Sequence, residues 1–106
     1  AAFMFPSLTE GFGLPPLESM LCGCPTVVSC AGAIPEVCGD ASLYVDPTDE
    51  AGWTRAMIDV VARGDAARQA AVEAGQRRAA PFTWARAARR LVDHLVAGDA
   101  QQRAAV

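Results

Sequence analysis

The feature that most limits the fold of this sequence is a set of three short apolar runs, at residues 2–5, 26–29 and 42–45. Runs of this length without polar alternation are typical of strands covered on both faces, which favours a parallel sheet. Residues 15–22 predict a helix between the first two runs, because paired prolines suit a first helical turn and Gly23 and Pro25 end it. This order of strand, helix and strand predicts an α/β fold with three parallel strands.

The second half of the sequence predicts helices. Residues 30–40 indicate a loop with one helical turn at 35–37, and beyond 47 apolar residues recur at three- and four-residue spacing. We predict helices from 48 or 49 to 64, from 65 to about 80, and from 83 to about 98, followed by a fraying tail. The predicted capping residues are Thr48 or Asp49, Asp65 and Thr83. The recurring apolar residues of the first of these helices are Trp53, Ala56, Met57, Val60 and Val61. Those expected on one face of the last helix are Trp84, Ala88, Leu91, Val92 and Leu95.

The length of 106 residues is enough for one small domain and too short for two. The sequence begins inside the first expected strand without an initiator methionine, so we interpret residues 1–106 as a single-domain fragment of a longer protein. No apolar run approaches the roughly 18 residues of a membrane span, and the N-terminus lacks a signal-type pattern, so we expect a cytoplasmic location. Four cysteines at 22–38 match no paired zinc-binding spacing and are expected to be small buried thiols.

Charge is divided unevenly along the sequence. Residues 1–50 carry seven acidic residues and no base, a net −7, whereas residues 51–106 carry nine arginines and five acidic residues, a net +4. The arginines at 77, 78, 86, 89 and 90 fit either an ordinary solvated helix face or a basic face for nucleic acid or anionic lipid. The single histidine, His94, is expected far from the strand ends and without a catalytic role.

The stretch from Ser7 to Glu18 is the candidate site, because ligands of parallel α/β sheets bind beyond the carboxyl ends of the strands. Gly11 and Gly13 let the backbone approach a ligand closely, and the amides near Phe12, Gly13 and Leu14 are available to an anion or a hydroxyl. A single Gly-x-Gly is a weak signal for phosphate binding. Glu10 and Glu18 could accept hydrogen bonds from sugar or ribose hydroxyls, or could be a solvated loop residue and a partner of the helix dipole. The residues alone leave both interpretations open.

A longer pattern carries a resemblance. The run "FPSLTEGFGLPPLESMLCGCPTVVSCAGAIPEVCGDASLYVDP" resembles the donor-binding part of the retaining glycosyltransferases of family four, the glycosyltransferase group 1 enzymes. The likeness covers residues 3–47 almost continuously, and Phe82-Thr83-Trp84 resembles a recurrent Phe-Ser-Trp before the family's last helix. It implies a GT-B architecture, in which this chain is half of a Rossmann-like domain, namely the second half of the donor-binding C-terminal domain.

The resemblance also implies roles for individual residues. Glu10 would be the catalytic-site acid that contacts the transferred sugar, Glu18 would bind the ribose hydroxyls, and the loop of Gly11, Phe12, Gly13 and Leu14 would meet the sugar or diphosphate. Gly32 and Glu36 match a later Gly-Gly-x-Pro-Glu segment, although Ala33 replaces its second glycine. The implied substrate is a nucleotide sugar, with no metal and no further cofactor.

The remaining expectations concern partners. A departing sugar diphosphate needs nearby cations, which the family takes from the preceding half of the domain, so we expect residues 1–106 to be inactive alone. The acceptor would bind through an absent N-terminal domain. We expect no nucleic-acid partner, while peripheral membrane association of the whole enzyme is compatible with the resemblance. The strand at 2–5 would lack a neighbour on one side, so we expect self-association through its edge.

Overall fold

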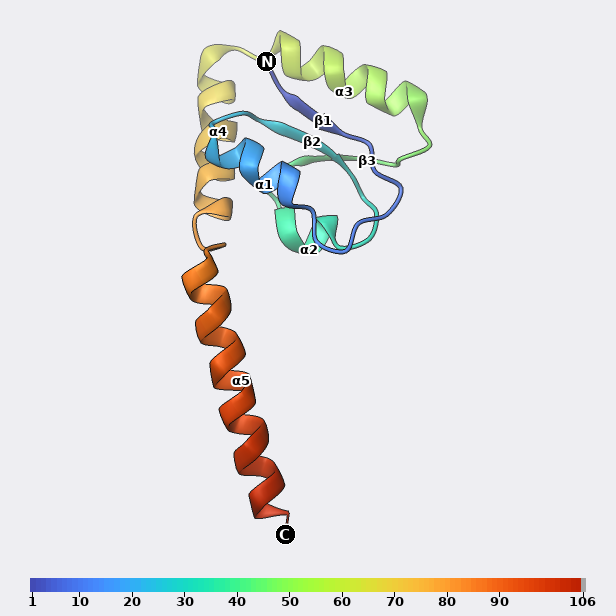
Figure 1. Cartoon of the computed structure of the whole chain (residues 1–106). Helices are drawn as coiled ribbons and strands as arrows, with labels where there is room; N and C mark the ends of the chain where they lie inside the picture. Colours follow the sequence, from blue (N-terminus) through green and yellow to red (C-terminus); the bar gives the residue numbers. More distant parts are fainter. Residues whose placement is uncertain (106) are drawn as a thin grey trace.

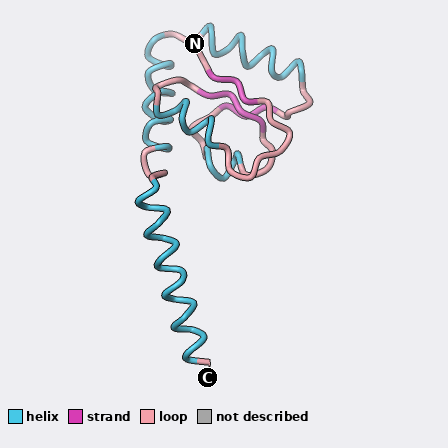
Figure 2. Tube along the Cα trace, viewed as in Figure 1, coloured by secondary structure: helices cyan, strands magenta, loops and turns pink. Residues whose placement is uncertain are grey.

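The computed structural model of the protein describes residues 1–105. It contains one three-stranded parallel sheet in the order β1-β2-β3, as Figures 1 and 2 show, and five helices among the described residues. The strands are β1 (Phe3–Phe5), β2 (Thr26–Ser29) and β3 (Leu43–Val45). The helices are α1 (Leu14–Leu21), α2 (Ile34–Cys38), α3 (Glu50–Ala62), α4 (Asp65–Ala79) and α5 (Trp84–Ala104). The predicted α/β fold with three parallel strands and C-terminal helices is confirmed.

The sheet is the middle of three layers. Alternate residues of β2 point to opposite faces: Val28 packs with α1, α2 and the end of α4, whereas Val27 packs with α3. Both valines are fully buried, as the apolar run predicts. β1 is only half-buried, because it lies at an edge of the sheet and pairs with β2 alone.

The layer of α1, α2 and α4 fixes where the candidate loop ends, because that loop leads into α1. Leu17 and Met20 of α1 and Ile34 of α2 are buried together beside Val28. Gly75 allows α4 to approach α1 closely, since a Cβ atom there would lie 3.1 Å from Cγ of Met20. The helix α1, from the first half of the chain, therefore packs against α4, from the second half.

The last helix departs from the prediction. In Figure 1, α5 projects away from the α/β body, which consists of β1–β3 and α1–α4. It continues to Ala104, whereas a fraying tail was expected after residue 98. Gly98 does not end it, and Asp99 and Arg103 pair four positions apart at 3.0 Å. The apolar face expected for this helix is exposed, with Leu91 62% and Leu95 65% accessible. Residue 106, the last of the expected tail, lies outside the described residues.

Two of the predicted caps are confirmed and one is wrong. The Asp49 carboxylate accepts a hydrogen bond from the Gly52 amide at 2.9 Å, and the Thr83 hydroxyl accepts one from the Arg86 amide at 3.1 Å. Asp65 does not cap α4: the chain enters in extended conformation at Gly64, which takes the capping position, so Asp65 falls in the first turn.

The cysteines and α3 also correct details of the prediction. Only Cys38 is buried, whereas Cys22 lies just past α1 and Cys30 lies in a loop past β2, and both are exposed. On α3, Trp53 and Ala56 are buried as expected, but Met57 and Val61 are exposed. Only one stripe of α3 faces the sheet, and these two side chains fall outside it.

None of the helices in residues 1–105 is both long and apolar enough to cross a bilayer.

Candidate functional site

The candidate loop, residues 7–13, follows β1. Two serines stabilise its first part through hydrogen bonds. Ser29, at the carboxyl end of β2 and fully buried, donates its hydroxyl to the Ser7 carbonyl at 2.5 Å. The Ser7 hydroxyl lies 2.9 Å from Oε1 of Glu10 and 3.0 Å from the Thr9 carbonyl, so these two acceptors share its one hydrogen. A side chain from the sheet thus fixes the start of the loop, and the loop in turn orients the Glu10 carboxylate.

A second loop supports the backbone of Glu10. The Ala33 amide donates to the Glu10 carbonyl at 3.1 Å. Gly32 lies beside the same peptide with φ +57°, and a Cβ atom there would stand 2.7 Å from the Glu10 carbonyl oxygen and 2.9 Å from its nitrogen. Only glycine allows both this conformation and this approach. The structure therefore brings the predicted residues Glu10 and Gly32 together.

The candidate amides of Phe12, Gly13 and Leu14 lie at the start of α1. Gly13 is buried in a left-handed conformation with φ 98°, occupies the capping position of α1 and provides no side-chain cap. Phe12 and Leu14 on either side of it are about half exposed. The helix α1 begins at Leu14, one residue earlier than expected. Backbone donors here can meet a negatively charged or hydroxyl-bearing ligand.

The two remaining site residues stand farther out. Glu18 is exposed and is the fifth residue of α1, just past its first turn. Glu36 is exposed on α2, and its backbone carbonyl, rather than its carboxylate, accepts a hydrogen bond from Arg78. The position of Glu36 gives it a structural contact and does not test a ligand-binding one.

Sequence reasoning missed four residues around the loop: Ser7, Ser29, Arg78 and Phe82. The serines lie inside the quoted run, and their place at strand ends was a usable signal. Phe82 was noticed only as part of a motif, yet its ring packs edge-on against Phe12 with centroids 5.9 Å apart. No sequence signal marks Arg78, because its partners lie some forty positions earlier.

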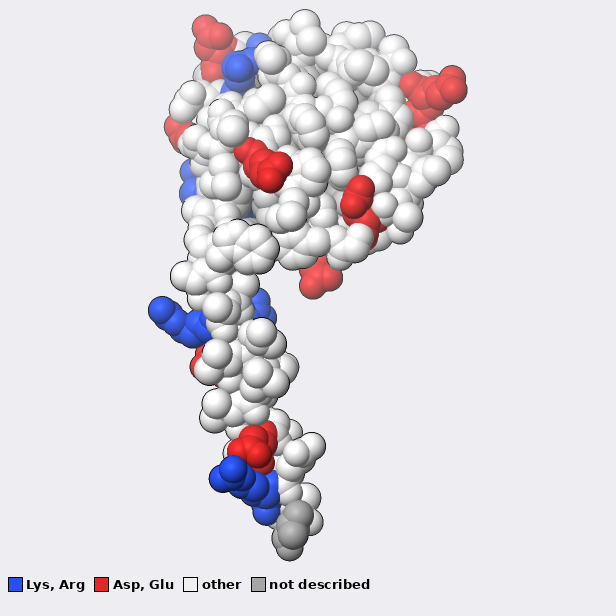
Figure 3. All heavy atoms as spheres, in the orientation of Figure 1, with Lys and Arg blue, Asp and Glu red and all other residues white. Residues whose placement is uncertain are grey.

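Most of the loop from Ser7 to Gly13 is exposed, and Glu10 is its one charged residue. Figure 3 shows acidic side chains scattered over the drawn face of the body, basic ones at its upper left and left edge, and side chains of both signs along α5. Two hollows of the chain lie elsewhere, one between β3 and α3 and one beside Arg77 and Arg78. Among residues 1–105, no cluster of histidine, cysteine and carboxylate side chains is suited to hold a metal ion. The loop offers one wall for a ligand rather than an enclosed pocket.

Comparison with known proteins identifies the family. The family model described as glycosyl transferases group 1 matches residues 1–63. The chain belongs to this family. O-antigen chain mannosyltransferase B of Escherichia coli is 42% identical over 82 residues, which are 77% of this chain and 21% of that protein. D-inositol 3-phosphate glycosyltransferase of Stackebrandtia nassauensis is 38% identical over 104 residues, covering 95% of this chain and 23% of that protein.

A solved structure supports the same assignment. Sucrose-phosphate synthase from Thermosynechococcus elongatus superposes with a TM-score of 0.73 and 30% identity, over 90% of this chain and 25% of that one. The resemblance inferred from the motif and the half-Rossmann fold are both confirmed. The chain spans about a fifth of the length of the first of these relatives and a quarter of the solved chain.

Proposed function

We propose that this chain forms part of the nucleotide-sugar side of a retaining glycosyltransferase, which transfers a sugar from that donor to an acceptor. The observation that carries the proposal is Glu10, held by Ser7, Ala33 and the approach of Gly32 at the carboxyl ends of β1 and β2. Membership of the glycosyl transferases group 1 family supports it, as do relatives named mannosyltransferase and inositol phosphate glycosyltransferase.

In the proposed site each group has a distinct ligand. The Glu10 carboxylate accepts hydrogen bonds from hydroxyls of the transferred sugar, near the reacting carbon. Glu18, the fifth residue of α1, accepts from vicinal hydroxyls of the ribose. The amides from Gly11 to Leu14 meet the sugar or the diphosphate. An ionised carboxylate suits a polyol because it accepts several charge-assisted hydrogen bonds and offers no donor that competes with them.

The cations that stabilise the departing diphosphate come, in this proposal, from outside residues 1–50, which contain no basic residue. The acceptor binds through a part of the enzyme not contained in this chain. We propose no metal and no cofactor besides the nucleotide sugar. Residues 1–106 alone are accordingly expected not to transfer sugar, and measurable transfer by them would overturn this part of the proposal.

The test uses the complete gene product and a panel of nucleotide sugars. Glu18→Ala should weaken binding of the nucleotide sugar and of the free nucleoside diphosphate alike, by calorimetry. Glu10→Gln should reduce transfer while leaving nucleoside diphosphate binding unchanged. Glu50→Ala, an exposed acid at the start of α3, is the matched control and should behave as the wild type. Unchanged binding and transfer in both site variants would contradict the assignment.

The alternative of a basic face for anionic lipid or nucleic acid loses support from the structure. Arg78, one of its five arginines, is engaged with backbone carbonyls of α2. The other four remain exposed. Binding to anionic vesicles or DNA with steep salt dependence, lost on charge reversal at Arg89 and Arg90, would favour this alternative and peripheral membrane association.

Location and self-association complete the proposal. We propose a cytoplasmic location, which the four unpaired cysteines support because a reducing compartment keeps thiols free. We further propose that residues 1–106 alone self-associate through β1, an edge strand of apolar residues. A monomer by light scattering at high concentration would contradict it.

A further inference from the structure

We propose that Phe82, held in place by Arg78, is a positioning residue that orders the Gly11–Gly13 loop for the donor. The inference rests on the proposed function of that loop, and it adds residues from the second half of the chain to the site. It starts from three contacts that join α2, the end of α4 and the candidate loop: Arg78 to the carbonyls of α2, Arg78 to Phe82, and Phe82 to Phe12.

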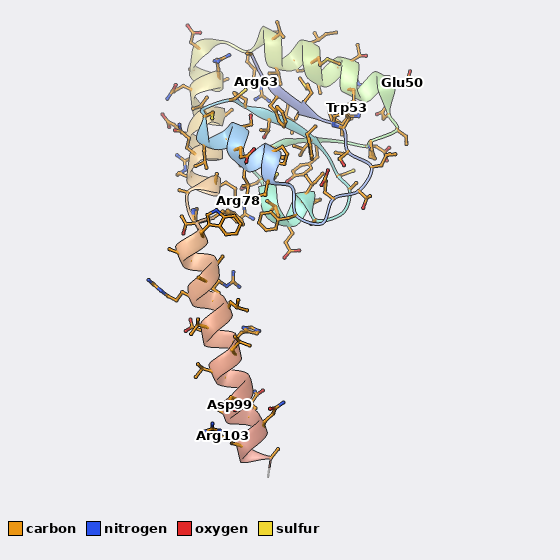
Figure 4. The ribbon with its side chains drawn as sticks, viewed as in Figure 1. Glu50, Trp53, Arg63, Arg78, Asp99 and Arg103 are labelled. Carbon is orange, nitrogen blue, oxygen red and sulfur yellow. The ribbon has the colours of Figure 1, made fainter. Side chains whose placement is uncertain are left out.

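The first contact immobilises the Arg78 guanidinium. Its Nε donates to the Val37 carbonyl at 2.7 Å, and its Nη2 donates to the Glu36 carbonyl, at the end of α2. Arginine side chains satisfy carbonyls at helix ends in this way. Gly39 makes room for the group, since it has φ +57° and a Cβ atom there would stand 3.1 Å from Nε. Figure 4 shows Arg78 at the end of α4 nearest to α5, level with α2.

The second contact places the Phe82 ring. Cζ of Arg78 lies 5.6 Å from the centroid of that ring, within the range of a cation–π interaction. The backbone restricts the ring further, because the Phe82 amide donates to the Ala79 carbonyl at 3.0 Å and the Thr83 amide donates to the Pro81 carbonyl at 3.1 Å. Phe82 is thus held between the end of α4 and the start of α5.

The third contact reaches the loop. The rings of Phe82 and Phe12 meet edge to face, with an interplanar angle of 74°. Phe12 stands between two glycines, which resist bending least of all residues, so an anchor on its side chain limits the positions of the amides on both sides. Glu10 has separate anchors in Ser7 and Ala33. Loss of the Phe82 contact should therefore loosen the amides while leaving Glu10 in place.

This separation predicts a specific kinetic pattern in the complete gene product. Phe82→Ala should raise KM for the donor about two- to tenfold, the range of an aromatic pair, because the loop must then be ordered on binding. The value of kcat should change less than twofold. Phe82→Tyr, which keeps the ring, should have the wild-type KM for the donor. Phe82→Leu, which keeps only apolar bulk, should have the raised KM of Phe82→Ala. Arg78→Ala should raise KM in the same direction, and its exposed neighbour Arg77 provides the control, Arg77→Ala.

A measurement independent of activity separates failure of this inference from failure of the proposed function. Hydrogen exchange of the amides from Gly11 to Leu14 should be faster in Phe82→Ala than in Phe82→Tyr or the wild type. Faster exchange without any nucleotide-sugar binding by the wild type would keep the positioning contact and overturn the proposed function. Transfer by the wild type, with exchange and KM unchanged in Phe82→Ala, would overturn the positioning role. An equal fall of kcat in all Phe82 variants would also overturn it, since that indicates general damage.

Discussion

The α/β body and α5 carry similar helical patterns with opposite outcomes. In the body, the apolar residues of α1, α2 and α3 close over both faces of the sheet, and Ile34 is completely buried. In α5, the equally regular apolar stripe contacts solvent, and Trp84 is 86% exposed. Amphipathic periodicity predicts that one face of a helix is suited to burial, but it does not name the surface that buries it. For α1, that surface is the sheet of the same chain.

The largest expected effect tests this difference with two comparable truncations. Ile34→Ala should lower the free energy of unfolding by about 2–5 kcal/mol, because it removes a buried side chain and leaves a cavity. Leu95→Ala, on the exposed stripe of α5, should change it by less than about 0.5 kcal/mol. Denaturant unfolding of residues 1–106 measures both. Equal losses would show that α5 is packed in solution.

A second comparison uses glycines, for which the same substitution should act in opposite directions. Gly32→Ala should cost about 1–3 kcal/mol, because the residue has positive φ and its Cβ would press on the Glu10 peptide. Gly98→Ala meets open space in the middle of α5 and should raise helicity, by up to about 1 kcal/mol of helix propensity. Unfolding midpoints and circular dichroism at 222 nm separate the two. Tolerance of alanine at position 32 would contradict the proposed support of Glu10.

The elements of the body were predictable because local chemistry and tertiary structure agree there. The prolines and glycines that bound α1 act within a few residues, and the valines of β2 are buried on both sides as an apolar run implies. The link from Arg78 through the Phe82 ring to Phe12 was not predictable, since Phe82 and Phe12 lie about seventy positions apart along the chain and Arg78 is itself held by carbonyls of α2. The exposure of α5 was missed for the same reason: no short-range rule sets what a helix packs against.

Substitutions at two equivalent helix caps should have a smaller effect and also compare the body with α5. Asp49→Ala should lower the stability of the body by about 1 kcal/mol, because α3 loses its cap while its Trp53 remains part of the core. Thr83→Ala removes an equivalent cap from α5 and should reduce helicity without moving the unfolding midpoint of the body. Coincident changes by Trp53 fluorescence, recorded with Trp84→Phe in place, and by circular dichroism in Thr83→Ala would indicate that body and α5 unfold as one unit.

The smallest expected effect is the pH dependence of the stability of the body, which the absorbance of the single tyrosine of the chain reports. Burial raises the pKa of Tyr44 to about 12, and its hydroxyl donates to the Gly39 carbonyl. The folded protein therefore holds this proton more tightly than the unfolded chain, whose tyrosine titrates near 10. The stabilisation is complete below about pH 10 and is lost as pH rises towards 12. Phenolate absorbance should show a midpoint near 12 in the native protein and near 10 in denaturant. Tyr44→Phe should remove the part of the alkaline loss of stability that Tyr44 causes and leave the part due to Cys38, whose pKa burial also raises. A native midpoint near 10 would mean that the β3 edge opens to solvent, which would narrow the difference between the body and α5.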